Sequence, residues 1–276
     1  MKIHFSKLEG LGNDFILLDG LKKELILTKA RALKLCDRHF GIGADGILLL
    51  LKPKSRGADF RMRIFNADGS EAEMCGNGIR CLARYLFDRG LSKKIRLRIE
   101  TRAGIMEVER RNHLFRVCIG RPEFAPEKVP VLSREPVIGK VLSLEGQKFR
   151  VTCVSVGNPH CVIPVENLPE IDLHRLGPKL ENHPWFPNRI NVELVEVVSR
   201  DHLQVRVWER GVGETLACGT GACAAVVACA RLGLCNHSAR VSLPGGDLGI
   251  EWKNDACYLT GPARLVYQGQ LDFGRF

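Results

Sequence analysis

The chain repeats its own sequence, and this internal repeat restricts the possible folds more than any other feature. The stretch "CGNGIRCLARYL" begins at Cys75, and "CGTGACAAVVA" begins at Cys218. From each cysteine an amphipathic stretch rich in Ala, Leu and Val runs to a glycine at the same distance, Gly90 in the first copy and Gly233 in the second. Because glycine commonly follows the last residue of a helix, both copies predict a helix of about four turns.

The repeat extends upstream of both helices. In each copy a Gly-Asn pair precedes an apolar stretch, and two further segments match before the cysteine is reached. The matching pairs are "GLGNDFILLDG" and "SVGNPHCVIPV", "GADGILLL" and "RINVELVEV", and "FNADGSEAEMCG" and "WERGVGETLACG". A repeat of about 120 to 140 residues is too long for a solenoid, so we expect two similar domains that face each other.

Strand-like segments fill the sequence around the two helices. The clearest are 94–101, 104–111, 114–120, 148–156, 191–198 and 202–209. Short strands around one good helix per half predict an α+β fold of two pseudo-symmetric domains from internal duplication, each a strongly curved, mainly antiparallel sheet or barrel wrapped around a central helix. We expect one domain at 1–122 plus 264–276 and the other at 123–263, with the Pro-rich segment 121–130 as the linker.

Composition and cysteine usage favour a soluble enzyme of the cytoplasm. Hydrophobic residues make up 45% and charged residues 26%, which is ordinary for a globular protein. No apolar run approaches the roughly 18 to 20 residues that a membrane span needs, and the N-terminus does not read as a secretory signal. Eleven cysteines without an export signal indicate a reducing compartment. No C-x-x-C spacing occurs, so we expect no metal.

The net charge of +10 raises the question of nucleic-acid binding. Basic residues cluster at 52–63, 93–98 and 110–116, but these segments alternate like strands and acidic residues interrupt the whole. Solvated strand faces explain the clusters, and no nucleic-acid-binding motif accompanies them. We therefore expect neither nucleic acid nor membrane as a partner.

A cysteine at a helix N-terminus lies beside unpaired backbone N–H groups and the positive end of the helix dipole. That environment can lower a thiol pKa from about 8.5 to roughly 3.5–7.5, and Gly-x-Gly lets a carboxylate approach the exposed amides. Two such sites, Cys75 and Cys218, suggest a pair that faces one ligand from opposite sides. A thiolate and a thiol so placed can invert a stereocentre by removing and returning a Cα proton. No cofactor motif is evident, so we expect no cofactor.

Several polar residues could hold a doubly charged amino acid near the cysteines. Each also has a structural interpretation: the asparagines as turn formers, the Glu-Arg pair as a surface ion pair, and the histidine as a buried structural residue. These alternatives stay open at the level of the residues alone. The candidates are Asn13, Asn66, Asn158, Asn191, His160, Glu209 and Arg210.

Several long motifs occur in one order along nearly the whole chain: "GLGNDF", "GIGADG", "FNADGSEAEMCGNGIRC", "VGNPHCV", "NRINVE", "WERGVGETLACGTGAC" and "GPARLVYQG". In them the chain resembles the diaminopimelate epimerases. These are cofactor-independent isomerases that convert LL- to meso-diaminopimelate in lysine and peptidoglycan precursor biosynthesis. The resemblance implies the two-lobed fold expected above and a homodimer, with Tyr267 at the dimer interface.

The resemblance also implies roles for the site residues. Cys75 and Cys218 would be the acid/base thiols, and Glu209 and His160 would take part in catalysis. The amides of Gly76, Asn77, Gly219 and Thr220 would hold the reacting carboxylate, while Glu209 would hold the reacting ammonium. The distal end of the substrate would contact Asn66, Asn158, Asn191 and Arg210, with Asn13 also lining the site. Gly46 departs from the many members that have a substrate-contacting glutamine at this position.

Other functions remain possible at this stage. A proline or hydroxyproline racemase-like enzyme would share the fold and the cysteine pair, but it has no use for Arg210 and three asparagines at a second carboxylate. A phenazine-biosynthesis-type isomerase shares the fold without the cysteine pair. From other classes, a thiol-disulfide switch would use the two cysteines, and a basic binding module would leave them unexplained.

Overall fold

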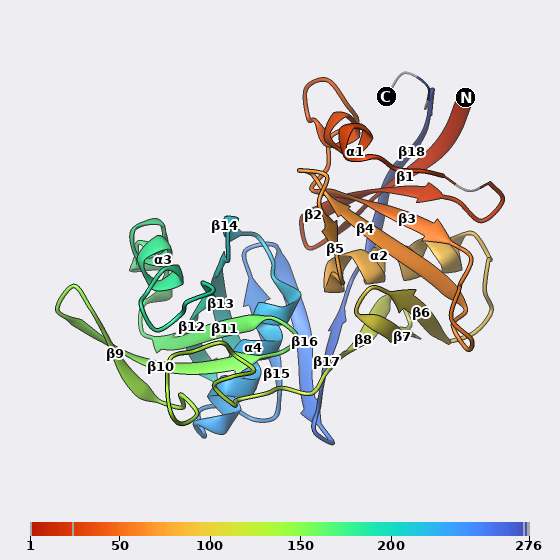
Figure 1. Cartoon of the computed structure of the whole chain (residues 1–276). Helices are drawn as coiled ribbons and strands as arrows, with labels where there is room; N and C mark the ends of the chain where they lie inside the picture. Colours follow the sequence, from red (N-terminus) through yellow and green to blue (C-terminus); the bar gives the residue numbers. More distant parts are fainter. Residues whose placement is uncertain (1, 24, 273, 275–276) are drawn as a thin grey trace. The chain divides into compact units, whose positions relative to one another are not determined.

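The computed structural model describes residues 2–23, 25–272 and 274, and the chain divides into two compact units (Figure 1). The first consists of Met1–Val117 and Gly261–Phe276, and the second of Cys118–Thr260. The expected domain limits include residues 273, 275 and 276, which lie outside the described part of the chain. Each unit is described by itself below.

The first unit is one curved sheet with a helix against it. Antiparallel pairs dominate, and the parallel pairs are β2–β3 and β4–β6. In spatial order the strands are β18 (Arg264–Asp272), β1 (Lys2–Gly10), β2 (Asn13–Asp19), β3 (Gly46–Leu51), β4 (Phe60–Asn66), β6 (Arg96–Thr101), β7 (Gly104–Arg111) and β8 (Leu114–Gly120), with the short β5 (Glu71–Ala72) beside β4.

Helix α2 (Gly76–Asp88) is the centre of the first unit. Ile79, Leu82 and Leu86 are fully buried and follow the helical period, so one face of the helix packs against the sheet. The helix contacts strands from β18 and β1 round to β7, which means that the sheet curves about it. A second helix, α1 (Lys29–Cys36), is capped by Thr28 and contacts β3.

The second unit has the same construction. Its parallel pairs are β11–β12 and β13–β15, and its other strand pairs are antiparallel. The strands are β9 (Lys140–Leu144), β10 (Gln147–Ser155), β11 (Pro159–Val165), β12 (Asn191–Ser199), β13 (His202–Glu209), β14 (Gly213–Thr215), β15 (Ser238–Leu243), β16 (Gly246–Lys253) and β17 (Ala256–Gly261). The helices are the 3₁₀ turn η1 (Leu168–Glu170), α3 (Leu173–Glu181) and α4 (Gly219–Arg231).

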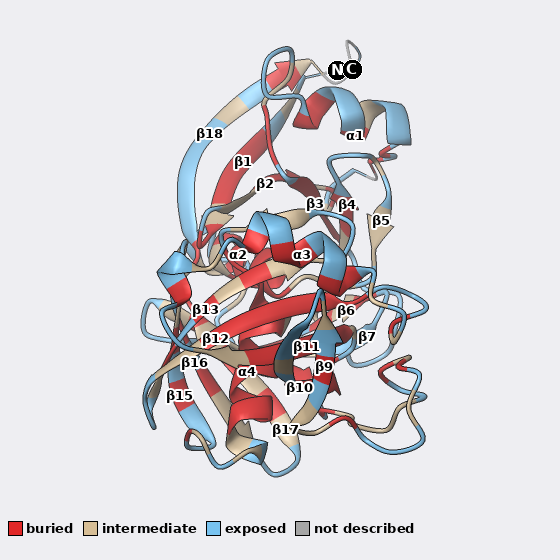
Figure 2. Ribbon diagram, turned by 90° about the vertical axis from the view of Figure 1, so that its left-hand side faces the viewer, coloured by how far each residue is buried: buried red, intermediate tan, exposed pale blue. Residues whose placement is uncertain are grey.

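Helix α4 is the counterpart of α2, and most of its residues are likewise buried (Figure 2). Its residues Ala222–Cys229 are all fully buried, and it contacts strands from β10 to β16. A helix that is apolar on nearly every side requires a sheet that curves around it, which is what the strand contacts show.

The two units match strand by strand, which confirms the internal duplication. The order β1-β2-β3-β4-β6-β7 recurs as β10-β11-β12-β13-β15-β16, with parallel pairs at the same places. The match holds at the level of single residues: Phe15 pairs with Gly46 in one unit, and His160 pairs with Asn191 in the other. The expected α+β fold of two curved, mainly antiparallel sheets around central helices is therefore confirmed.

The Pro-rich segment 121–130, expected as a linker, packs onto the second unit. Glu123 and Ser155 exchange backbone hydrogen bonds, and Val129 is 1% exposed in the apolar core of this unit. Burial of this valine and the backbone pairing hold the segment in place, so it belongs to the second unit.

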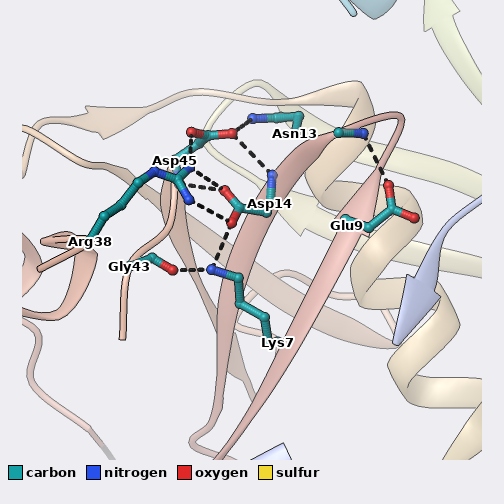
Figure 3. A network of polar contacts seen from close by, with 8 residues as sticks. Lys7, Glu9, Asn13, Asp14, Arg38, Gly43 and Asp45 are labelled. Carbon is teal, nitrogen blue, oxygen red and sulfur yellow. Dashed lines mark hydrogen bonds and ion pairs between the residues drawn. The ribbon is translucent and has the colours of Figure 1, made fainter. Parts of the chain in front are cut away.

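A buried ion pair ties the loop after α1 to strands β1 and β2 (Figure 3). Lys7 is 6% exposed; its Nζ lies 2.7 Å from Asp14 Oδ2 and also donates to the carbonyl of Gly43. Arg38 donates to Asp14 Oδ1 at 2.9 Å and to Asp45 Oδ1 at 2.7 Å. Burial alone would raise the pKa of Asp14, but the hydrogen bonds from Arg38 and Lys7 outweigh it and hold the pKa at about 2.

The low pKa of Asp14 predicts a pH-dependent contribution to stability. A carboxyl group whose pKa is lower in the folded chain stabilises it above the unfolded pKa of about 4, and this contribution is lost as the pH falls toward 2. Asp14→Asn should therefore lower the free energy of unfolding by about 2 kcal/mol at neutral pH, and the difference from the wild type should shrink as the pH falls from about 5 to about 2. Urea unfolding at several pH values measures both.

Asp247→Asn is the control for this prediction. The Asp247 side chain is 53% exposed and lies 3.8 Å from Arg240, so its loss should change stability by less than about 1 kcal/mol. An Asp14→Asn defect of constant size across the pH range would contradict the role given to the ion pair.

Candidate active site

Both sequence-predicted cysteines are the N-cap residues of the central helices. Cys75 has an extended backbone with φ −143° and ψ 122°, and its sulfur accepts the N–H of Gly78 at 3.5 Å. Cys218 has φ −112° and ψ 113°, and its sulfur accepts the N–H of Gly221 at 3.4 Å. Each thiol thus lies at the positive end of a helix, next to backbone amides without partners inside the helix.

The second glycine of each Gly-x-Gly allows a strand to pack directly against the helix entrance. A Cβ on Gly78 would lie 3.0 Å from Leu48 Cδ2, and a Cβ on Gly221 would lie 2.9 Å from Glu193 Oε1. A larger residue would crowd these side chains. The glycine therefore sets the position of the cysteine relative to the sheet.

In the first unit two predicted residues, Asn13 and Asn77, lie close to Cys75. Asn13 Oδ1 lies 3.8 Å from the Cys75 sulfur and accepts from Asn77 Nδ2 at 3.3 Å. The other end of the Asn13 amide donates to Asp45 Oδ2 at 2.9 Å (Figure 3). Because Asp45 can only accept, it fixes the amide with its oxygen toward Cys75. Arg38 holds Asp45 in turn.

Buried Arg80 supports the same helix entrance. The side chain is fully buried and donates to the carbonyl of Gly76 at 3.0 Å and to Asn77 Oδ1 at 2.9 Å. It also reaches the carbonyl of Pro262, before β18, at 3.1 Å. These bonds hold the backbone of Gly76 and the side chain of Asn77, the two residues expected to bind a carboxylate.

Gly46 and Asn66 form a neighbouring pair across β3 and β4. The Asn66 side chain is exposed and donates to Ser70 Oγ at 2.9 Å. A Cβ on Gly46 would lie 2.7 Å from the carbonyl oxygen of Phe65, so glycine fits closely here and offers no side chain. Tyr267 is not part of this group: it lies on β18, is 45% exposed, and its ring stands edge-on to Phe5.

In the second unit Glu209 and Arg210 end strand β13. Thr215 Oγ1 donates to Glu209 Oε1 at 2.6 Å, which orients this half-buried carboxylate. Asn191 accepts the backbone N–H of Arg210 at 2.8 Å and donates to the carbonyl of Pro159 at 2.7 Å. The Arg210 side chain is exposed and touches the carbonyl of Asn188 at 3.2 Å.

His160 is fully buried at the start of β11. Its Nε2 lies 2.9 Å from Asn158 Oδ1, and its Nδ1 lies 2.6 Å from Glu193 Oε1. Both ring nitrogens are therefore engaged, one by a predicted site residue and the other by a carboxyl group that we did not predict.

The expectation of a lowered thiol pKa is wrong for Cys218. Burial is the main cause and raises its pKa well above the usual value, and the nearby carboxylate of Glu209 raises it further. Hydrogen bonds from Thr220 and the N–H of Gly221 act in the opposite direction but do not prevail. Desolvation of the charged sulfur thus exceeds the effect of the helix end.

Three residues that the motifs contain were not singled out from the sequence: Asp45, Thr215 and Glu193. Asp45 stands in "GADG" beside the unusual Gly46, and Thr215 stands at the end of β14, three residues before Cys218. The repeat could have revealed Glu193, since its counterpart in the apolar strand "GILLLL" is Leu48.

Within residues 2–23, 25–272 and 274, no group of three or more His, Cys, Asp or Glu side chains could hold a metal ion. In the same residues no helix is long and apolar enough to cross a membrane.

Solved structures of proteins from other families have a similar fold. A phenazine biosynthesis protein of the PhzF family from Bacillus anthracis has a TM-score of 0.69 at 19% identity, covering 99% of both chains. A hydroxyproline epimerase from Agrobacterium vitis has a TM-score of 0.69 at 14% identity, covering 98% of this chain and 92% of its own. At such low identity these similarities establish the fold alone.

Sequence comparison is more specific. The diaminopimelate epimerase from Acetivibrio thermocellus is 49% identical over 98% of this chain and 99% of its own length. The family model described as diaminopimelate epimerase matches residues 5–125 and 152–266, which include both helix entrances. The chain therefore belongs to the diaminopimelate epimerase family.

Proposed function

We propose that this protein converts LL-2,6-diaminopimelate to meso-diaminopimelate by a two-base mechanism at Cα. The observation that carries the proposal is the repeated one: a cysteine caps the central helix at the same place in both units of a chain of this family. A stereocentre has two faces, and inverting it requires a proton carrier for each. This need explains why the motif occurs twice.

The chemistry needs only the two thiols. The thiolate of one cysteine takes the Cα proton, and the electron pair of the broken C–H bond stays on carbon. The thiol of the other cysteine gives its proton to the opposite face and is left as a thiolate. Either of Cys75 and Cys218 can begin as the thiolate, depending on which stereoisomer is bound, so the reaction runs in both directions.

The helix entrances would stabilise the carbanion. Its charge spreads into the substrate carboxylate, which the amides of Gly76 and Asn77 and of Gly219 and Thr220 would hold. Amides fixed in a helix need no reorganisation as charge develops, which makes such stabilisation effective. Glu209, oriented by Thr215, would hold the reacting ammonium group.

The distal end of the substrate carries a second carboxylate and a second ammonium group. We assign its recognition to Asn66, Asn158, Asn191 and Arg210, with Asn13 also lining the site. Arg210 is the natural partner of the carboxylate because its exposed guanidinium group has donors to spare beyond the bond to Asn188. This second charged end of the substrate distinguishes diaminopimelate from proline.

We also propose that the protein acts as a homodimer in the cytoplasm. Leu265, Val266 and Tyr267 on β18 are 38%, 56% and 45% exposed, and a row of exposed apolar side chains on one strand suits contact with a second copy. The eleven cysteines favour a reducing compartment.

The first test follows hydrogen at Cα. Purified, reduced protein incubated with LL-diaminopimelate in D₂O, without added cofactor, should form the meso isomer with deuterium at the inverted carbon. The reason is that the proton delivered by the second thiol comes from solvent. NMR measures both label and product, and no exchange with this substrate would contradict the proposed function.

The second test removes each thiol. Cys75→Ala and Cys218→Ala should each lower kcat by at least about 1,000-fold, since one face of Cα then has no proton carrier. Cys81→Ala and Cys223→Ala, one or two turns further along each helix, are matched controls and should keep most of the activity. Full epimerisation by either of the first two variants would exclude the two-base mechanism.

The third test concerns the distal site. Arg210→Met should raise KM by about 10- to 100-fold, the loss expected when a charge-assisted hydrogen bond to a carboxylate is removed. Thermal unfolding should be unchanged because the side chain is exposed. Arg189→Met is the control: Arg189 also has an exposed side chain but pairs with Glu181 at 3.3 Å. Equal KM values for the Arg210→Met variant and the wild type would remove Arg210 from the site.

A further inference from the structure

A buried pair of ionisable side chains in the second unit stands out among the described residues. His160 and Glu193 are both fully buried, on the neighbouring parallel strands β11 and β12. His160 Nδ1 lies 2.6 Å from Glu193 Oε1, and the second carboxyl oxygen of Glu193, Oε2, has no hydrogen-bond partner there. Burying such a pair is costly, and an apolar pair of similar volume is often as stable or more so.

The first unit shows that the fold does not need this pair. At the positions equivalent to His160 and Glu193 it has Phe15 and Leu48, which are both buried. In the first unit Leu48 and Phe15 lie against Gly78 in the first turn of the central helix, and in the second unit Glu193 lies against the equivalent Gly221. One scaffold thus fills the same place with apolar side chains in one copy and with a histidine and a carboxyl group in the other. Packing alone does not account for the difference.

The hydrogen-bond partners of His160 limit where its protons can be. The amide oxygen of Asn158 faces Nε2 at 2.9 Å and can only accept, so Nε2 carries a hydrogen. One further proton lies between Nδ1 and Glu193 Oε1. Wherever it resides, imidazolium with carboxylate or imidazole with carboxylic acid, the pair has no net charge. This neutrality makes its burial tolerable.

We propose that Glu193 is a positioning residue for His160. By sharing one proton with Nδ1 of His160, it keeps Nε2 protonated and directs the Nε2–H toward Asn158. This inference rests on the proposed function, in which His160 takes part in catalysis and Asn158 binds substrate. Without Glu193 the histidine would lose the partner that fixes its tautomer and ring orientation, as happens to other catalytic histidines deprived of their carboxylate.

The first experiment replaces Glu193 by its amide. E193Q keeps the shape of the side chain but cannot share the proton or carry the charge. We expect kcat to fall by about 10- to 100-fold with KM changed less than about threefold. Because the buried pair has lost its shared proton, the pH dependence of kcat should also change.

Other groups near the pair also titrate, and they stay in place in this variant. They are Glu209 on β13, Cys161 on β11 and Cys218 on α4. E196Q is the matched control, because Glu196 lies on the same strand and accepts the N–H of Leu168 at 2.9 Å. It should leave kcat and the pH profile as in the wild type. An E193Q variant that behaves like E196Q would overturn the proposal.

A spectroscopic measurement separates this proposal from the proposed function. In the wild type, ¹⁵N NMR of the His160 ring should show the chemical shift of a protonated nitrogen for Nε2. The chemical shift of Nδ1 should lie between those of a protonated and an unprotonated nitrogen. In E193Q the chemical shift of Nδ1 should move to that of the unprotonated nitrogen of a neutral imidazole. Identical ring signals in the two proteins would overturn the role of Glu193, whether or not the wild type turns over diaminopimelate. Changed ring signals in a protein without turnover would instead count against the proposed function alone.

A double variant covers the case in which E193Q fails to fold. H160F/E193L installs the pair that the first unit has at the same positions. It should fold with a thermal midpoint within a few degrees of the wild type, as expected for a well-packed apolar pair, and should have no measurable epimerisation. If the double variant failed to fold, the pair would be structural and the proposal would be wrong.

Discussion

The contact on which both halves of the molecule depend is the close approach of a strand to the N-terminus of a helix. In each unit the strand that begins at Gly46 or Asn191 reaches the first turn of the central helix, and glycine at position 78 or 221 leaves just enough room. The approach fixes the helix start, and with it the capping cysteine and the amides that follow. The curved sheet then buries the rest of the helix, so the reactive end is held by the core of the unit.

The duplicated scaffold is symmetric, but the side chains at equivalent places are not. Phe15 and Leu48 correspond to His160 and Glu193, and Gly46 corresponds to Asn191. The symmetric parts, a cysteine cap and its amides, suit the two faces of one carbon. The side chains that differ between the two units suit a substrate that has different groups on different sides of that carbon. In the proposed function, duplication supplies two proton carriers, and divergence between the copies supplies substrate recognition.

Much of this could be predicted because the same pattern is present twice. The helices after Cys75 and Cys218 end before Gly90 and Gly233, which have the positive φ values of 63° and 73° expected for a residue that terminates a helix. Strands β7, β8 and β13 coincide with the predicted segments. Asp45 and Glu193 were not predicted, because their importance lies in contacts with Asn13 and His160, distant in sequence. Local patterns do not contain such contacts.

The pKa of Cys218 shows most clearly what the sequence could not provide. The helix end and the N–H of Gly221 were visible in the motif, but the complete burial of the sulfur and the nearness of Glu209 depend on the tertiary fold. Together they raise the pKa of Cys218, whereas the helix end alone would lower it. The reversal suits the proposed chemistry, because a Cα proton is very weakly acidic and a thiolate of raised pKa is a stronger base toward it. A buried thiol also keeps its proton until carbon is ready to accept it. Burial, which would disable a cysteine meant to attack an electrophile, is therefore an advantage for one that must exchange protons with carbon.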